Sequence, residues 1–225
     1  MLFTTSNPKT QKGESLGYLT AILHLAPADS AGKGTVCPKS TPQCRATCLY
    51  FAGRGQMPPV QKARVRKTLD YLYDRQAFAL QLSEEVSTLY RRADRAGLKL
   101  AVRVNGTSDL PQLARAVELL TPEAPTFYDY TKVFGSWEYN RRIHYTFSRS
   151  ESNEVECRDA LKQGVNVAVV FSTKKGLPLP TTYLGVRVID GDAHDLRFLD
   201  PKGVVVGLRA KGRARKLTGG FVVQV

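Results

Sequence analysis

Three cysteines stand close together in a proline- and glycine-containing segment, residues 35–55, in the pattern C-x6-C-x3-C. They are Cys37, Cys44 and Cys48, while the fourth cysteine, Cys157, is distant in sequence. Where nothing in the sequence suggests export, clustered cysteines are more often metal ligands or catalytic groups than disulfides. The segment therefore predicts a metal site or a catalytic thiol site.

Two metal centres are compatible with three clustered thiols. A structural zinc ion needs four ligands, and here the fourth would come from a distant residue, Cys157, His24, His144 or His194. An iron–sulfur cluster usually has four cysteine ligands, so three would leave one iron open for a substrate or cofactor. Unbound, packed thiols are the third interpretation, and we favour it for Cys157, which falls within a predicted helix.

The elements around this loop alternate between strands and helices. Residues 15–25 form an apolar, strand-like run that ends before the cysteines, and residues 45–53, RATCLYFAG, read as the first turns of a helix that carries Cys48. Residues 58–97 keep apolar positions at helical spacing and predict two helices with a break near Asp74. Short β-branched or aromatic runs and helical segments follow. This alternation predicts one α/β domain over residues 15–225 with a parallel sheet, after a polar lead-in at 1–14.

Polar and reactive residues gather at the carboxyl end of each predicted strand. In α/β sheets and barrels the loops at that edge converge on a shared site. Helix capping is the alternative explanation, and it is the one we favour for Asp109 and Ser152. The residues expected at the shared edge are Asn105, Thr107, Ser108, Asp129, Lys132, Ser148, Arg149, Glu151, Asp190 and Asp192.

Three cysteines after the first strand of a parallel α/β domain resemble the radical S-adenosylmethionine (SAM) enzymes. The resemblance implies a partial parallel (β/α)6–8 barrel and a [4Fe–4S] cluster bound by Cys37, Cys44 and Cys48, with SAM on the open iron. In that superfamily, reductive cleavage of SAM gives a 5′-deoxyadenosyl radical that abstracts hydrogen. The spacing here departs from the usual C-x3-C-x2-C, and the sequence NGTSD stands where a glycine-rich acidic motif is expected.

The same resemblance implies roles for the strand-end residues. Asn105, Thr107 and Ser108 would meet the amino and carboxylate groups of SAM. Ser148, Arg149 and Glu151 would meet its carboxylate and ribose, since arginine clamps a carboxylate and a carboxylate accepts ribose hydroxyls. Asp129, Lys132, Asp190 and Asp192 would face the substrate.

Over most of the chain, the blocks SLGYLTAILHLAPAD, NGTSD, FYDYTK, TFSRSE and DGDAHD also resemble an uncharacterised family of phage and phage-derived proteins. This resemblance implies a phage gene whose product acts in the host cytoplasm. It implies no established activity.

The net charge of +13 favours a polyanionic partner. Two basic runs, KARVRK at 62–67 and KGRARK at 211–216, would suit a phosphate backbone, or they are simply solvated surface. We expect a nucleotide or nucleic-acid substrate. No stretch has the length and apolarity of a membrane span, and no secretory signal is visible, so we expect a cytoplasmic protein.

Two other functions remain open at this stage. One is a zinc-stabilised, basic nucleic-acid-binding protein whose cysteines are structural. The other is a metal-dependent nuclease that uses Asp190, Asp192 and Glu151, since oxygen-rich sites accept hard divalent cations.

Overall fold

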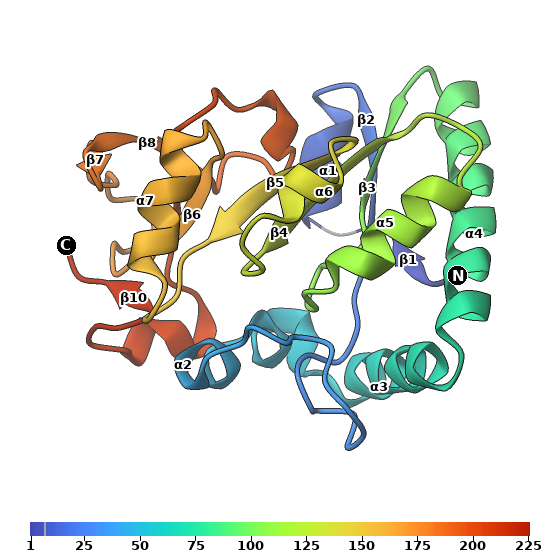
Figure 1. Cartoon of the computed structure of the whole chain (residues 1–225), viewed down its shortest axis with the longest axis horizontal. Helices are drawn as coiled ribbons and strands as arrows, with labels where there is room; N and C mark the ends of the chain where they lie inside the picture. Colours follow the sequence, from blue (N-terminus) through green and yellow to red (C-terminus); the bar gives the residue numbers. More distant parts are fainter. Residues whose placement is uncertain (7) are drawn as a thin grey trace.

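A computed structural model describes residues 1–6 and 8–225 of the chain (Figure 1). Its strands form one sheet in the order β1-β2-β3-β4-β5-β6-β9-β8-β7, with β10 paired to β6. The strands are β1 (Phe3–Thr4), β2 (Tyr18–Leu23), β3 (Lys99–Arg103), β4 (Thr126–Thr131), β5 (Ile143–Ser148), β6 (Val167–Phe171), β7 (Thr182–Tyr183), β8 (Val186–Asp190), β9 (Val205–Arg209) and β10 (Val222–Val223). Pairing is parallel from β2 through β9 to β8, and only β1 and β7 pair antiparallel within the described residues. The predicted α/β domain with a mostly parallel sheet is confirmed.

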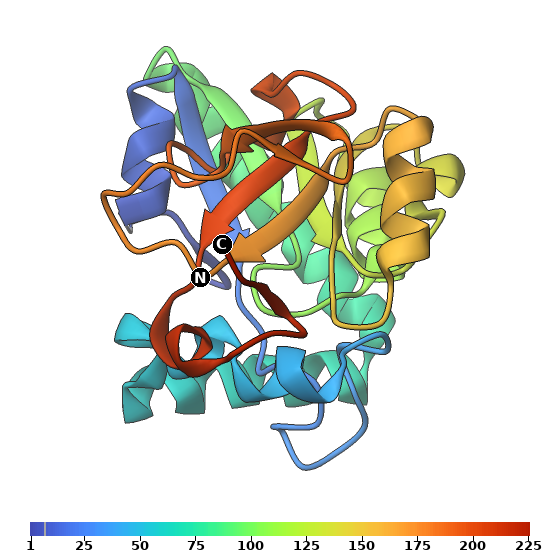
Figure 2. The ribbon, with the colours of Figure 1, turned by 90° about the vertical axis from the view of Figure 1, so that its left-hand side faces the viewer.

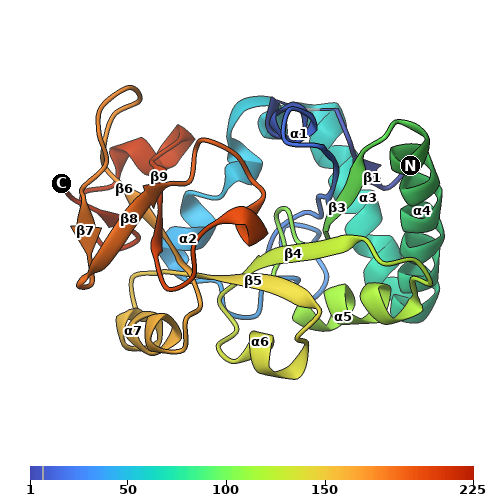
Figure 3. The same cartoon turned by 90° about the horizontal axis from the view of Figure 1, so that it is seen from above.

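The sheet curves and stays open, and several of the helices cover its outer face (Figure 3). The α-helices are α1 (Pro8–Glu14), α2 (Pro42–Ala46), α3 (Pro58–Tyr73), α4 (Arg75–Arg95), α5 (Pro111–Leu120), α6 (Ser136–Tyr139) and α7 (Glu154–Lys162). Four 3₁₀ turns complete the described part: η1 (Leu49–Phe51), η2 (Gly53–Gln56), η3 (Arg197–Leu199) and η4 (Gly212–Lys216). None of the helices in residues 1–6 and 8–225 combines the length and apolar composition that crossing a membrane requires.

The main core lies between α4, α5 and the first strands. Phe78, Leu82, Val86 and Leu89 of α4 are buried at three- and four-residue spacing, as the apolar pattern predicts. The predicted helix break is also confirmed: Asp74 has an extended backbone between α3 and α4, and its carboxylate accepts from the first amides of α4.

The strand order decides where a site can form. Strands β2 to β6 are neighbours in chain order and run parallel, so their carboxyl ends share one edge. Figure 2 shows β6 and β9 pointing toward that edge, where α2, α3 and η4 lie. Every loop that leaves this edge is therefore within reach of the others.

The amino-terminal residues belong to the fold. The expected polar lead-in at 1–14 contains β1, which pairs with β2, and helix α1; residue 7 lies outside the described residues. Phe3 is buried in the main core.

Candidate functional site

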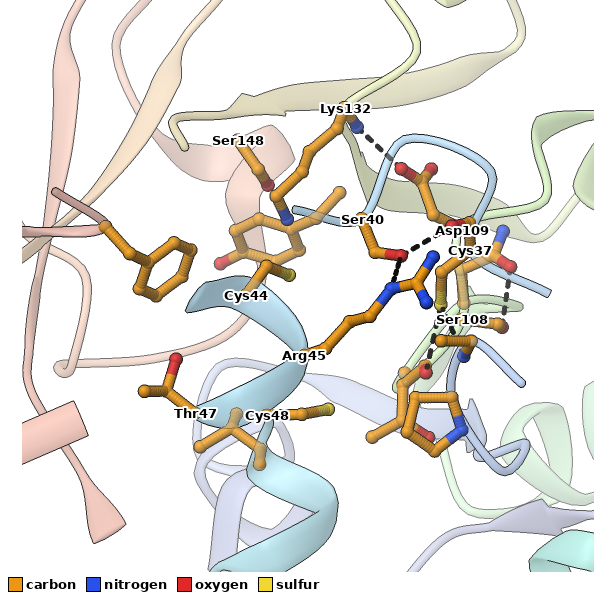
Figure 4. A pocket seen from close by; sticks show the side chains of 18 of the residues that line it. Cys37, Ser40, Cys44, Arg45, Thr47, Cys48, Ser108, Asp109, Lys132 and Ser148 are labelled. Carbon is orange, nitrogen blue, oxygen red and sulfur yellow. Dashed lines mark hydrogen bonds between the residues drawn. The ribbon is translucent and has the colours of Figure 1, made fainter. Parts of the chain in front are cut away.

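A cavity of about 380 Å³ opens at the carboxyl ends of the parallel strands, and all three clustered cysteines line it (Figure 4). Nine of the predicted site residues are in its wall: Cys37, Cys44, Cys48, Asn105, Thr107, Ser108, Lys132, Ser148 and Arg149. The other four, Asp129, Glu151, Asp190 and Asp192, lie outside the lining. The structure thus gathers the cysteines with the ends of β3, β4 and β5.

The cysteine loop is not the helix that the sequence suggests. Helix α2 ends at Ala46, so Cys44 lies in it but Cys48 does not. Thr47 bonds back through its hydroxyl to the carbonyl of Gln43, and Cys48 has an extended backbone before η1. The expectation that Cys48 sits in the first turns of a helix is wrong. Both thiols nevertheless line the cavity.

Each sulfur has a hydrogen-bond donor beside it. The amide of Ala28 donates to Cys37 Sγ at 3.2 Å, and Ala28 adopts a left-handed backbone with φ of 50°. Burial raises the pKa of Cys37 to about 12 and also raises that of Cys48, although the backbone amide of Tyr50 favours the Cys48 thiolate. A metal that bound here would have to displace the thiol protons of Cys37 and Cys48. Left-handed backbone at a non-glycine residue such as Ala28 is strained, and such strain clusters at functional sites.

Lys132 supplies a half-buried positive charge to the thiols. Burial opposes its charged form, but Cys44, to which it hydrogen-bonds, and Asp109 together hold the pKa of Lys132 above its usual range. Asp109 accepts from the backbone amide of Lys132 at 2.8 Å and from Thr131 Oγ1 at 2.8 Å. Asp109 therefore joins the ends of β3 and β4 and does not cap α5, whose first residues receive no side-chain cap.

The model of one protein family, described as gene product 88 (GP88), matches residues 1–224. This chain belongs to the GP88 family. The match confirms the resemblance to an uncharacterised phage-type family. No curated protein and no solved structure matches the chain.

In this GP88-family chain the segment after β3 is a tightly bonded turn. Asn105 Oδ1 accepts from Ser108 Oγ and from the Leu110 amide, while Asn105 Nδ2 donates to Asp129 Oδ2 at 2.8 Å. Thr107 Oγ1 donates to the carbonyl of Leu25 at 2.6 Å. The polar side chains of this turn therefore hold its shape at the cavity wall, and Asp129 supports it from beneath.

Glycine is required at one position of this turn. A Cβ on Gly106 would lie 2.6 Å from the carbonyl oxygen of Leu23 and 2.6 Å from Nδ1 of His24. The close approach lets the turn after β3 lie directly against the end of β2, beside the cysteine loop.

Glu151 anchors the cysteine loop from β5. Its carboxylate accepts from Thr41 Oγ1 at 2.7 Å and from the amide of Gln43 at 3.0 Å, at the amino end of α2. Burial opposes ionisation, but these bonds hold the pKa of Glu151 below its usual range. The C-terminal segment binds the same helix, since the amide of Phe221 donates to Gln43 Oε1 at 2.7 Å.

Asp190 and Asp192 hold a cavity-lining arginine. Arg209 Nη1 lies 2.9 Å from Asp190 Oδ2 and 3.2 Å from Asp192 Oδ2, and Lys211 Nζ lies 2.6 Å from Asp192 Oδ1. Arg209 and Lys211 face the cavity while the two carboxylates do not. The aspartates thus position basic side chains.

Sequence reasoning missed a charge network in the cavity wall: Arg103 and Tyr130 line the cavity, while the buried Asp129 and Asp195 lie outside its lining. Arg103 ends β3 and pairs with Asp195 at 3.1 Å and with Asp129 at 3.7 Å, and its guanidinium lies 4.3 Å from the ring centroid of Tyr130. Burial raises the pKa of Asp129 to about 7, against the effect of Arg103. A charged residue at the end of an otherwise apolar strand was the one available signal for this network.

The thiol arrangement can be compared with what each metal centre needs. No three His, Cys, Asp or Glu side chains in the described part of the chain are placed to hold a single metal ion. A zinc ion bound at about 2.3 Å would bring its sulfur ligands to within roughly 4 Å of one another. An iron–sulfur cluster spreads its thiolates over several irons, so they stand further apart. The structure shows that the three thiols line one cavity, at Cys37, Cys44 and Cys48. Cys157, fully buried in α7, is the packed thiol that was predicted.

Proposed function

We propose that this protein is an iron–sulfur enzyme of the radical SAM type. In this proposal Cys37, Cys44 and Cys48 hold a [4Fe–4S] cluster whose fourth iron is open to SAM, and the open, curved sheet corresponds to a partial (β/α) barrel. The observation that supports it most directly is the convergence of three thiols on one cavity at the carboxyl edge of parallel strands in sequential order. When bound, the cluster would pass one electron from an external reductant to SAM, which yields methionine and a 5′-deoxyadenosyl radical.

The chain's own residues would prepare this cavity in three ways. Lys132 places a positive charge beside Cys44 and offsets the negative charge that thiolates and a cluster gather. Arg149 lines the cavity at the end of β5, and its guanidinium, oriented by the carbonyl of Gly220 at 2.7 Å, suits a carboxylate. The tightly bonded turn around Asn105 forms the wall between the cysteines and β4. We place this activity in the host cytoplasm.

The test is anaerobic reconstitution followed by measurement of iron, sulfide and zinc. We expect about four irons per chain with absorbance typical of a [4Fe–4S] cluster, and release of 5′-deoxyadenosine when SAM and a reductant are added. Cys37→Ser, Cys44→Ser and Cys48→Ser should each lose the cluster, whereas the matched control Cys157→Ser should keep it. One zinc per chain, or a cluster indifferent to all three substitutions, would refute the proposal.

A further inference from the structure

The excess of positive over negative charge in this protein comes from two segments. Residues 30–69 and 209–225 together carry thirteen lysines and arginines and no aspartate or glutamate, which equals the net charge of +13. The rest of the chain carries twenty basic and twenty acidic residues, from totals of 33 and 20. Basic residues spread evenly along the chain would not produce this separation. The place of these two segments in the fold is therefore informative.

The fold brings these two segments together at the mouth of the cavity. The Arg213 guanidinium lies 4.4 Å from the ring centroid of Phe51, and Gly212 is packed so closely that a Cβ there would lie 2.9 Å from Cβ of Ala52. Figure 2 shows η4 lying beside the segment that holds η1 and η2. Phe51 itself lines the cavity. The basic surface is therefore continuous with the cavity wall.

Much of this charge is available to a partner. Arg54, Arg213, Arg215 and Lys216 are exposed, and none of them takes part in the ion pairs found among the described residues. Unpaired cations on one surface attract phosphates, and they release counterions when they bind them. We call the exposed cations of η2 and η4 the basic rim, and it comprises these four residues.

We propose that the basic rim binds the phosphate backbone of a single-stranded nucleic acid and presents one nucleotide to the cysteine-lined cavity. The substrate class inferred here rests on the proposed function. Binding of a strand to the basic rim does not itself require an iron–sulfur cluster. A single strand is favoured because a base in a duplex must first be unpaired and flipped out of the stack before it can enter a cavity. Aromatic and apolar side chains in the wall, among them Phe51 and Phe221, offer a base an apolar surface.

The experiment measures anisotropy of fluorescent DNA and RNA single strands of about 12 nucleotides, within the range of known single-strand sites, and of the matching duplex, over a series of salt concentrations. The test variant combines Arg213→Gln, Arg215→Gln and Lys216→Gln. The control combines Arg91→Gln, Arg92→Gln and Arg95→Gln, which removes the same charge from exposed positions at the end of α4. That end precedes β3 and so lies at the amino edge of the sheet, away from the cavity.

Each phosphate contact on a single strand contributes about 0.7 to the log–log salt slope, or roughly fivefold in affinity at 0.1 M salt. The η4 variant should therefore bind on the order of a hundredfold more weakly, with a slope smaller by about 2, while the α4 variant stays within about twofold of the wild type. The tighter of the two single strands identifies the substrate as DNA or RNA. Equal weakening by both variants, no weakening by either, or equally tight duplex binding would overturn the inference. If the protein holds an iron–sulfur cluster but binds no strand, only the inference about the basic rim is rejected. If it binds single strands but holds no cluster, only the proposed enzyme function is rejected.

Discussion

Replacing Glu151 by alanine should loosen the cysteine loop without unfolding the domain. The carboxylate accepts two hydrogen bonds, from Thr41 Oγ1 at 2.7 Å and from the Gln43 amide at 3.0 Å, and no other strand-end carboxylate does this for α2 among the described residues. Glu151 is partly exposed, so we assign about 1 kcal/mol to each bond. Loss of about 2 kcal/mol raises the population of the opened loop about 30-fold.

Trypsin provides the assay, because Lys39 and Arg45 are exposed within the loop. When opening is fast relative to cleavage, the rate of cleavage follows the opened population. We expect cleavage after these two residues to accelerate about 30-fold in Glu151→Ala, with reduced iron uptake on reconstitution. Glu154→Ala is the matched control, since among the described residues that carboxylate forms an ion pair with Arg158, one turn along α7. If the loops of both variants are cleaved at the wild-type rate, Glu151 does not anchor the loop.

Three further predictions concern the stability of the folded chain, each measured by urea denaturation. Gly106→Ala should lower the free energy of unfolding by about 2 kcal/mol or more, because its Cβ would stand 2.6 Å from the carbonyl oxygen of Leu23; an unchanged midpoint would contradict this packing. Leu82→Ala should cost about 3 kcal/mol, since Leu82 is 0% exposed, whereas Leu80→Ala, at 44% exposed, should cost far less. Burial lowers the pKa of His144, so the unfolded chain binds its proton more readily and stability falls as the pH drops below about 6.5. His144→Asn should weaken that acid sensitivity, and an identical pH profile would show that this histidine does not contribute.

The sequence predicts the strands and helices well because their signals are local. Apolar spacing in α4 and the polar position Asp74 identify two helices and the break between them. Alternating strands and helices imply parallel pairing, and parallel strands gather their carboxyl ends at one edge. The cysteine loop, the turn at Asn105 and the end of β5 at Arg149 could therefore be assigned to a shared site before the structure was known.

The roles of individual polar residues could not be predicted in this way. Asp129, Glu151, Asp190 and Asp192 occupy the expected edge, yet each binds another part of the protein, and none lines the cavity. Neighbouring positions at a strand end can point into a cavity or into the layer beneath it. Which of these two directions a side chain takes depends on partners that come from distant segments of the chain.

Local patterns of residues are enough to predict the element types, the cysteine cluster and the amount of positive charge. Where that charge lies depends on the tertiary structure, because residues 30–69 and 209–225 meet through packing of η4 against η1. The tertiary structure also decided the end of α2 before Cys48, where a side-chain hydroxyl bonds back to the helix. Contacts between segments more than a hundred residues apart leave no local pattern, and it is such contacts that build the cavity and its rim.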